Sequence, residues 1–522
     1  MSIGGVASPA VESNLTAAEG FWSLIVDRAE RSGGQPMLSD EHGNSLTFSE
    51  FRVKAERVAA ALHAEGIGRG TTVAWQLPTR ISTALVMAAL ARLGAVQAPI
   101  IPIYRERETG AAVATSAAEV ILVPGAWRGT DYVAMAEGLP GHASVMTIGL
   151  DAPESADVSS LPPAPGVSED VRWIYFTSGS SGLPKGVRHA DGSLLAAARG
   201  FALRGGLGQQ PDEVGGVPFP IAHVGGLIYL MTVLLAGFPA VLVEAFDPAV
   251  TAELFRRHRV TFTGGSTVFY TALLNEQRKL AAGEQLLPSL RLLKGGGAPC
   301  PPSVYYAVRT ELHSALAHDY GATEVPMICV ASPGDTDEQL AQTEGRPIPG
   351  NQVRIVDDEV ELPTGRDGEI QVKGAAVFRG YTDPALTSAA FTADGWFRTG
   401  DLGHLRPDGH VEVTGRLKDM IIRKGENIGP VEVEALIAEH PAVAEVAVIG
   451  LPDDERGELV CAVITTRPAV AAPTLTDLVD QLREAGLMPQ KLPERLEIVD
   501  ELPKTGIGKP DKQSLRRRFV TS

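Results

Sequence analysis

Cysteine is scarce in this chain. Only three of its 522 residues are cysteines, and Cys300, Cys329 and Cys461 lie far apart with no C-x-x-C spacing. This scarcity argues against a disulfide framework and against a zinc site built from cysteines. A reducing cytoplasm is therefore the expected location of the protein.

Long runs of basic residues are also missing. The formal net charge is −17, and no stretch holds five or six consecutive lysines or arginines. Proteins that bind nucleic acid usually carry a basic patch or stripe. Nucleic acid is therefore not an expected partner, and any phosphate ligand must be bound by local geometry.

Neither a targeting signal nor a membrane-spanning segment is expected in this chain. Residues 1–20 have neither a basic region nor a continuous apolar run, so they are interpreted as a partly disordered lead-in and not as a signal peptide. Residues 224–243 carry no charge and are long enough to span a membrane, which leaves that alternative to be weighed. Because Gly237 and Pro239 interrupt the run, the pattern favours a buried helix at about 227–236 and a buried strand at 240–245.

Apolar segments of strand length alternate with helical patterns over most of the first 400 residues. Clear examples are the strands at 71–77, 96–103 and 120–124 and the helix at 81–95. This alternation predicts parallel β-α-β units, and hence an α/β fold. The hydrophobic content of 44% supports a large core in a protein of several domains.

The last hundred or so residues have a different pattern. Gly429 and Pro430 open a predicted helix at 431–440, which is followed by strands at 443–451 and 459–467 and by a further helix. We expect a compact α+β module there, with a boundary near residue 416.

The segment 177–187, TSGSSGLPKGV, combines glycines, hydroxyl side chains and one lysine after a predicted buried strand at 171–176. Glycines allow backbone N–H groups to approach an anion closely, and Lys185 adds a positive charge. A flexible Gly/Ser linker is the alternative. Because Pro184 precedes the lysine, the Walker pattern does not fit, and we predict a phosphate loop of another kind between a strand and a helix.

Five further stretches occur in a fixed order with this loop. They are KGGGAP at 294–299, DYGATE at 319–324, TGD at 399–401, GRLKD at 415–419 and PKTGIGKPDK at 503–512. Together the six motifs resemble the adenylate-forming superfamily, which contains acyl-CoA synthetases, aryl-CoA ligases, luciferases and peptide-synthetase adenylation domains. The resemblance extends from about residue 20 onward.

The resemblance implies an architecture. A large N-terminal part with several subdomains, residues 21–415, would bind ATP and a carboxylic acid. A small mobile α+β domain, residues 416–522, would swing over it about a hinge at Lys418.

The same resemblance implies the nucleotide contacts. The phosphate-loop residues expected to hold the β- and γ-phosphates are Thr177, Ser178, Gly179, Ser180, Ser181, Gly182 and Lys185. The adenine site would be formed by Gly297, Ala298, Asp319 and Tyr320, with Tyr320 stacking and Asp319 accepting from an exocyclic amine. Asp401 would accept from the ribose hydroxyls, with Arg416 nearby.

Three residues are implied to act in the first half-reaction. Thr323 would contact the α-phosphate, and Glu324 would hold Mg²⁺ through its carboxylate. Both residues could instead be ordinary residues at a helix start. Lys509, in a loop bracketed by glycines, would neutralise charge in the transition state, and a solvated tail lysine is the alternative.

In the second half-reaction, rotation at Lys418 would withdraw Lys509 and place Gly425 beside the pantetheine arm of CoA. The alternative for Gly425 is a simple turn. His223 is implied to lie near the carboxylate and the mouth of the acyl tunnel, and a hydrogen-bonded packing residue is the alternative.

The identity of the acid is the least constrained feature. Residues 218–226 contain no aspartate to pair with an ammonium group, so an acid without an α-amino group is expected. Glycines around this site would leave room for a bulky or long apolar acid, although each could equally serve a turn. These glycines are Gly225, Gly226, Gly264 and Gly265.

The sequence therefore predicts a ligase that converts a fatty, alicyclic or aromatic acid to its acyl-adenylate and then to acyl-CoA, with ATP, Mg²⁺ and CoA. One alternative enzyme would load a carrier protein or perform only the adenylation. Another alternative is a non-catalytic scaffold that retains the fold. The sequence leaves both a monomer and a homodimer open.

Overall fold

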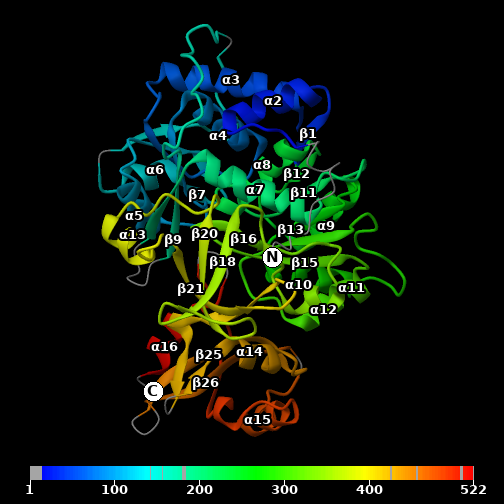
Figure 1. The fold of residues 1–522 in the computed structure, drawn as a ribbon. Helices are drawn as coiled ribbons and strands as arrows, with labels where there is room; N and C mark the ends of the chain where they lie inside the picture. Colours follow the sequence, from blue (N-terminus) through cyan, green and yellow to red (C-terminus); the bar gives the residue numbers. More distant parts are fainter. Residues whose placement is uncertain are drawn as a thin grey trace.

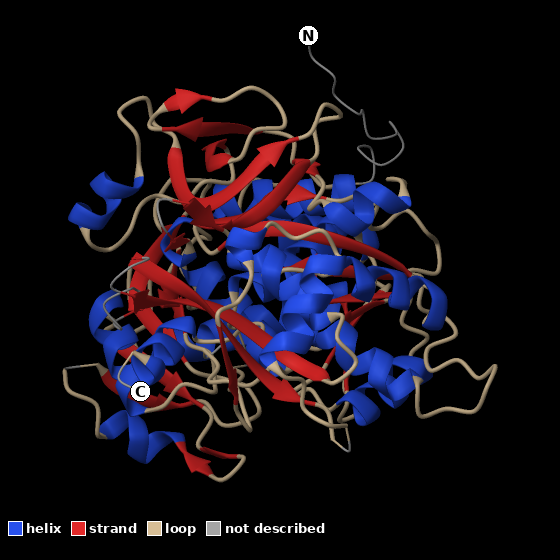
Figure 2. Cartoon of the chain, turned by 90° about the horizontal axis from the view of Figure 1, so that it is seen from below, coloured by secondary structure: helices blue, strands red, loops and turns tan. Residues whose placement is uncertain are grey.

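The computed structural model describes residues 15–141, 143–155, 157–178, 184–423, 426–453, 457–468, 470–505 and 509–520. Residues up to about 416 form the large upper part of Figure 1, and the orange and red C-terminal residues form a smaller part below it. Helices and strands intermingle throughout the view from below (Figure 2). This is the α/β architecture that the alternating sequence pattern predicts.

The largest sheet has parallel strands in its centre and antiparallel pairs at its edges. In spatial order it contains β17 (Arg346–Pro347), β16 (Val325–Val330), β15 (Ala315–Ala322), β14 (Leu292–Gly296), β13 (Phe262–Gly264), β11 (Gly215–Val217), β12 (Ala240–Leu242), β1 (Pro36–Asp40) and β2 (Ser45–Thr47). Its central strands β11, β12 and β13 are short and fully buried, as expected for a parallel sheet covered on both faces.

A second sheet contains the β-α-β units that the sequence predicts near the N-terminus. In spatial order it contains β10 (Pro184–His189), β9 (Trp173–Ser178), β4 (Val96–Pro99), β3 (Thr72–Trp75), β5 (Val120–Val123) and β8 (Ser144–Thr147). Strand β3 pairs in parallel with β4 and β5, which confirms the predicted crossovers.

Helices fill the space between and around these sheets. They are α2 (Phe21–Ser32), α3 (Phe48–Ala64), α4 (Ile81–Leu93), α5 (Glu106–Ser116), α6 (Tyr132–Glu137), α7 (Asp191–Gly205), α8 (Val224–Ala236), α9 (Pro248–Arg257), α10 (Thr267–Gln277), α11 (Pro302–Glu311), α12 (Asp337–Gln342) and α13 (Pro384–Ala390). Helices α4 and α8 are apolar almost all round and buried, so they belong to the main core.

The apolar segment 224–243 forms a buried helix and a buried strand, as predicted. Helix α8 ends at Gly237, whose φ of 80° reverses the chain, and β12 follows at Ala240. Among the helices of the described residues, none is both long enough and apolar enough to cross a bilayer.

An antiparallel sheet leads from the main body to the C-terminal residues. It contains β19 (Val360–Glu361), β18 (Asn351–Asp357), β20 (Gly368–Gly374), β21 (Phe397–Leu405) and β22 (Val411–Arg416). A short β6–β7 hairpin (Ala126–Trp127 and Thr130–Asp131) stands apart from it.

The C-terminal domain has its own sheet and its own apolar clusters. The sheet contains β24 (Glu426–Ile428), β23 (Ile421–Arg423), β26 (Gly457–Thr466), β25 (Val443–Asp453) and β27 (Arg495–Ile498). The helical elements are η1 (Leu417–Asp419), α14 (Pro430–Ala438), α15 (Leu475–Glu484), η2 (Pro489–Lys491) and α16 (Lys512–Phe519). The predicted helix after Gly429 and the two long strands are therefore confirmed as elements.

Candidate active site

The predicted phosphate loop connects two antiparallel strands. Strands β9 and β10 pair so that Thr177 lies opposite Lys185. The expectation that a helix follows the loop was wrong, because strand β10 comes first and α7 begins only at Asp191. Residues Gly179, Ser180, Ser181 and Gly182 and the side chain of Ser178 lie outside the described residues.

Thr323 and Glu324 occupy the tight connection between β15 and β16, and not a helix start. His189 donates from Nε2 to the carbonyl oxygen of Thr323 at 2.8 Å. Burial lowers the pKa of His189 to about 4, so this imidazole is neutral at physiological pH. A rigid, uncharged support therefore holds the backbone of the predicted α-phosphate residue.

The carboxylate of Glu324 is held on one side only. The Tyr381 hydroxyl donates to Glu324 Oε1 at 2.7 Å. Within the described part of the chain, no hydrogen bond reaches Oε2 of this half-buried residue. A free carboxylate oxygen is the ligand type that a hard cation such as Mg²⁺ prefers.

Asp401 lies at the centre of a buried polar group. Its Oδ1 is 2.7 Å from Nε of Arg416, which stands opposite it on β22, and Tyr320 donates to its Oδ2 at 2.7 Å. Burial, followed by the charge of Asp401, raises the pKa of Tyr320, so the phenol keeps its proton. The structure thus brings together three residues that the sequence had assigned to adenine and ribose.

Asp319 forms a buried ion pair that the sequence did not indicate. The Lys294 ammonium lies 2.9 Å from Asp319 Oδ1 and 2.7 Å from the carbonyl oxygen of Ala331, and the ammonium is fully buried. Burial raises the pKa of Asp319 to about 6, although Lys294 opposes the rise. Oδ1 of Asp319 already accepts from Lys294 and from the Ala331 N–H. The predicted contact of Asp319 with the exocyclic amine of adenine would therefore have to use Oδ2, and it remains a prediction.

Two glycines leave the space that the Lys294–Asp319 pair needs. A Cβ on Gly205 would lie 2.4 Å from Cε of Lys294, and a Cβ on Gly296 would lie 1.9 Å from the carbonyl oxygen of Asp319. Gly297 has a φ of 89° and open space where a Cβ would stand. Ala298 follows it and is half-buried.

His318 is a site residue that sequence reasoning missed. It is 5% exposed, and its imidazole hydrogen-bonds the backbone of Ala298, while Nδ1 has no partner in the described structure. Burial lowers its pKa to about 4. The residue directly precedes the DYGATE motif, so inspection of the whole strand β15 would have drawn attention to it.

Lys509 reaches the site from the C-terminal domain. Burial, and next the positive charge of Arg416, lowers the pKa of Lys509 to about 8, whereas Asp401 opposes this shift. The same ammonium contributes to the lowered pKa values of His223 and His318. Lys509 therefore interacts electrostatically with Asp401, His223 and His318, and it is half-buried and not fully solvated.

His223 is the N-cap residue of α8. Its Nδ1 accepts the Gly225 N–H at 3.1 Å, so the proton of the neutral ring is on Nε2. Burial, and next the charge of Lys509, lowers the pKa of His223 to about 4. This histidine can therefore donate a hydrogen bond but does not carry a positive charge near neutral pH.

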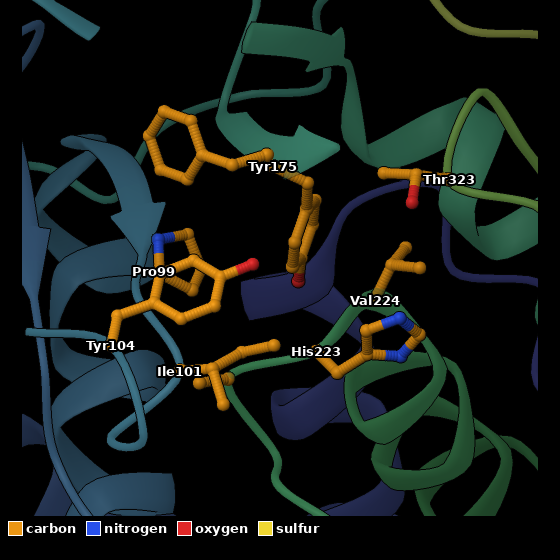
Figure 3. Close-up of a pocket in the computed structure, with 9 residues that line it drawn as sticks. Pro99, Ile101, Tyr104, Tyr175, His223, Val224 and Thr323 are labelled. Carbon is orange, nitrogen blue, oxygen red and sulfur yellow. The ribbon is translucent and has the colours of Figure 1, made fainter. Parts of the chain in front are cut away.

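A small cavity, partly open to solvent, lies beside His223. It is lined by Pro99, Ile101, Tyr104, Tyr175, Phe176, Ala222, His223, Val224 and Thr323. In Figure 3 the hydroxyl groups of Tyr104 and Tyr175 turn toward each other. His223 and Thr323 lie on the opposite side of Tyr175 from Tyr104. Among the described residues that line it, none is an aspartate, glutamate, lysine or arginine.

The interpretation that glycines leave room for a large acid was wrong for three of the positions. A Cβ on Gly226 would lie 2.5 Å from Cα of Ile221, and one on Gly264 would lie 1.8 Å from the Lys294 carbonyl oxygen. A Cβ on Gly265 would lie 2.5 Å from the Phe269 ring. These glycines permit close packing and do not open a pocket.

Lys418 lies in the short helix η1, directly after β22. Arg516 on α16 donates to the carbonyl oxygens of Lys418 and Asp419, each at 3.4 Å. The hinge role of Lys418 remains a prediction. Gly425 lies outside the described residues.

A second group of metal-ligand side chains is less suitable than Glu324. Glu41, His42 and Glu244 place ligand atoms within 4.8 Å of one another. However, Glu244 already accepts from Arg80 and Trp127. Because a neighbouring guanidinium opposes cation binding, we assign no metal to this group.

The fold and the site together define an adenylate-forming enzyme, and comparison with known proteins gives the family. Residues 25–382 match the model of the AMP-binding enzyme family, and residues 432–509 match that of the AMP-binding enzyme C-terminal domain. The chain therefore belongs to the AMP-binding enzyme family, which is part of the adenylate-forming superfamily.

Individual relatives differ in what they act on. The chain is 31% identical to the medium-chain fatty-acid–CoA ligase of Escherichia coli (strain K12), over 92% of this chain and 87% of that protein. It is 32% identical to the salicyl-AMP ligase / salicyl-S-ArCP synthetase of Mycobacterium tuberculosis, over 99% and 94%. The o-succinylbenzoate CoA synthetase of Bacillus subtilis, solved with ATP and magnesium ion, superimposes with a TM-score of 0.82 at 26% identity, over 94% and 98%.

Replacement of Lys509 tests its assignment to the first half-reaction. We expect Lys509→Ala to reduce acid-dependent pyrophosphate release at least about 100-fold, because a charge partner of the transition state is lost. The exposed Lys504→Ala, on the same loop, is the control and should retain the rate. Near-normal release by Lys509→Ala would show that the assignment is wrong.

The pH dependence of adenylation should report the titration of Lys509. With a pKa of about 8, its ammonium is present below this pH and is lost above it. We therefore expect kcat/KM for ATP to fall about tenfold per pH unit above pH 8. In Lys509→Arg this decline should disappear between pH 7 and pH 10, and an unchanged decline would assign the titration to another group.

Proposed function

We propose that this enzyme activates an apolar carboxylic acid with ATP to an acyl-adenylate and then transfers the acyl group to CoA, giving acyl-CoA, AMP and pyrophosphate. The observation that carries the proposal is the electrostatic interaction of Lys509 with Asp401 and Arg416, which form an ion pair. It supports a site in which a cationic side chain of the C-terminal domain faces Asp401, the residue proposed to contact the ribose. The non-catalytic scaffold is disfavoured because such a scaffold has no need for a desolvated lysine.

In this proposal the residues of the chain act mainly by orienting the reactants and neutralising charge. Lys185 and the phosphate loop hold the leaving pyrophosphate, and Lys509 neutralises charge near the transferring phosphorus. Asp401 accepts from the ribose hydroxyls, and the Tyr320 ring lies against the base. Glu324 would hold Mg²⁺, which supplies further neutralisation of phosphate charge when it is bound.

The cavity beside His223 and Thr323 supports an acid without a second charge. None of the lining residues that the structure describes carries a formal charge at neutral pH, since His223 is neutral. A second carboxylate or an ammonium on the substrate would therefore be desolvated without a partner. The Nε2–H of His223 is a suitable donor to a carboxylate oxygen of the acid.

A second candidate function is an enzyme that loads the acyl group onto a carrier protein. The similarity to the salicyl-AMP ligase / salicyl-S-ArCP synthetase favours it. In both candidates we propose that the C-terminal domain, from about residue 416, turns at Lys418 after adenylation. This motion would withdraw Lys509 and bring Gly425 to the thiol.

Incubation with alternative thiols separates the two candidates. The enzyme, ATP, Mg²⁺ and a panel of uncharged fatty, alicyclic and aromatic acids are combined with CoA alone, or with CoA and phosphopantetheinylated carrier proteins. We expect acyl-CoA by mass spectrometry in the first mixture. Acylated carrier protein without acyl-CoA would favour the second candidate.

Narrowing the cavity tests whether it receives the acid. Ala222 is 2% exposed and lines the cavity, so Ala222→Val should raise KM for the acid about tenfold by crowding. KM for ATP in pyrophosphate exchange should change less than about twofold, and the thermal midpoint serves as the control for folding. A defect confined to thioester formation would show that the cavity serves the thiol instead.

A further inference from the structure

The backbone of residues 379–382 pairs with strand β10. None of the six sequence motifs includes these residues. Tyr381 forms an antiparallel bridge with Val187, and the N–H of Thr382 donates to the carbonyl oxygen of Gly186 at 2.8 Å. Gly186 must lack a side chain here, because a Cβ would lie 2.7 Å from Cγ2 of Thr382. This segment is therefore fixed against β10, the strand that leaves the phosphate loop.

Tyr381 connects the phosphate-loop lysine with the carboxylate of Glu324. Its hydroxyl donates to Glu324 Oε1 at 2.7 Å, and Lys185 Nζ lies 5.5 Å from the centroid of its ring. The side chain is 6% exposed, and burial followed by the charge of Glu324 raises its pKa. The phenol therefore remains a donor over the whole physiological pH range.

The backbone of Glu324 is hydrogen-bonded to Phe378, the residue directly before this segment. The N–H of Phe378 donates to the carbonyl oxygen of Glu324 at 2.9 Å, and the rings of Phe378 and Tyr381 pack edge to face at 4.8 Å. The N–H of Tyr381 itself donates to Thr387 Oγ1 at 2.8 Å. Both the position of the phenol and the position of the carboxylate are thus determined by one short segment.

We propose that Tyr381 is a positioning residue for the metal–nucleotide complex. Its hydroxyl holds Oε1 of Glu324, which would leave Oε2 available to a cation, and its ring lies near the ammonium of Lys185. This inference rests on the proposed function, in which Glu324 binds Mg²⁺ and Lys185 binds phosphate. Tyr381 itself touches neither the metal nor the substrate.

Metal binding to an inert nucleotide complex tests the role of the hydroxyl without turnover. Wild-type and Tyr381→Phe proteins are saturated with α,β-methylene-ATP and titrated with Mn²⁺, and free Mn²⁺ is followed by electron paramagnetic resonance. We expect Kd for Mn²⁺ to rise about tenfold in Tyr381→Phe, as the loss of a hydrogen bond to a charged group implies. Affinity for the analogue without metal should change less than about twofold, since phenylalanine keeps the ring under Lys185.

Tyr305→Phe is a matched control. The Tyr305 hydroxyl donates to Asp337 Oδ1 at 2.7 Å, so this substitution removes a bond of the same type and length away from Glu324. Its Kd for Mn²⁺ should equal that of the wild type. A similar rise in both variants would attribute the effect to general destabilisation and overturn the proposal.

A double substitution tests whether the hydroxyl acts through Glu324. Glu324→Gln weakens Mn²⁺ binding by removal of the charge, and addition of Tyr381→Phe to it should have less than about a twofold further effect. Equal effects of Tyr381→Phe in both backgrounds, or an unchanged Kd in the single variant, would overturn the inference. Failure of the wild type to bind Mn²⁺ with the analogue would instead contradict the proposed function on which it rests.

Discussion

The site depends on the burial of a positive charge from one domain among polar groups of another. Lys509 is half-buried there, burial and next the charge of Arg416 lower its pKa to about 8, and Asp401 is the negative group that opposes this shift. A desolvated ammonium without a negative partner is costly, so an anionic ligand would stabilise the arrangement. On the proposed function, a bound nucleotide would therefore stabilise this domain arrangement.

Buried polar groups of the N-terminal part form a framework near the residues that interact with Lys509. The Lys294–Asp319 pair joins β14, β15 and the start of the loop after β16, and the Tyr320–Asp401–Arg416 group joins β15 to the antiparallel sheet. The Lys294–Asp319 pair, Tyr320 and Asp401 are buried and hydrogen-bonded, whereas Arg416 is exposed, so the buried members have little freedom to move. A rigid framework of this kind suits the orientation of reactants.

The sequence predicted the α/β class, the two-part organisation and the motif residues Tyr320, Asp401 and Arg416 that lie together in the structure, because these follow from hydrophobic period and from motifs in order. It did not predict Lys294, His318 or Tyr381, whose roles arise from contacts between distant segments. The glycines near the acid site were misinterpreted for a related reason. A glycine that opens space and a glycine that permits backbone contact look the same in a sequence, and only the packing at Gly264 and Gly265 separates them.

The central claim is that a carboxylate displaces pyrophosphate at the α-phosphorus of ATP. The most direct measurement follows ATP labelled at the α-phosphate during incubation with the enzyme, Mg²⁺ and the acid panel, with products separated by chromatography. The account predicts label in acyl-adenylate and AMP, only when a suitable acid is present. Label in ADP, with orthophosphate released and no AMP formed, would contradict it.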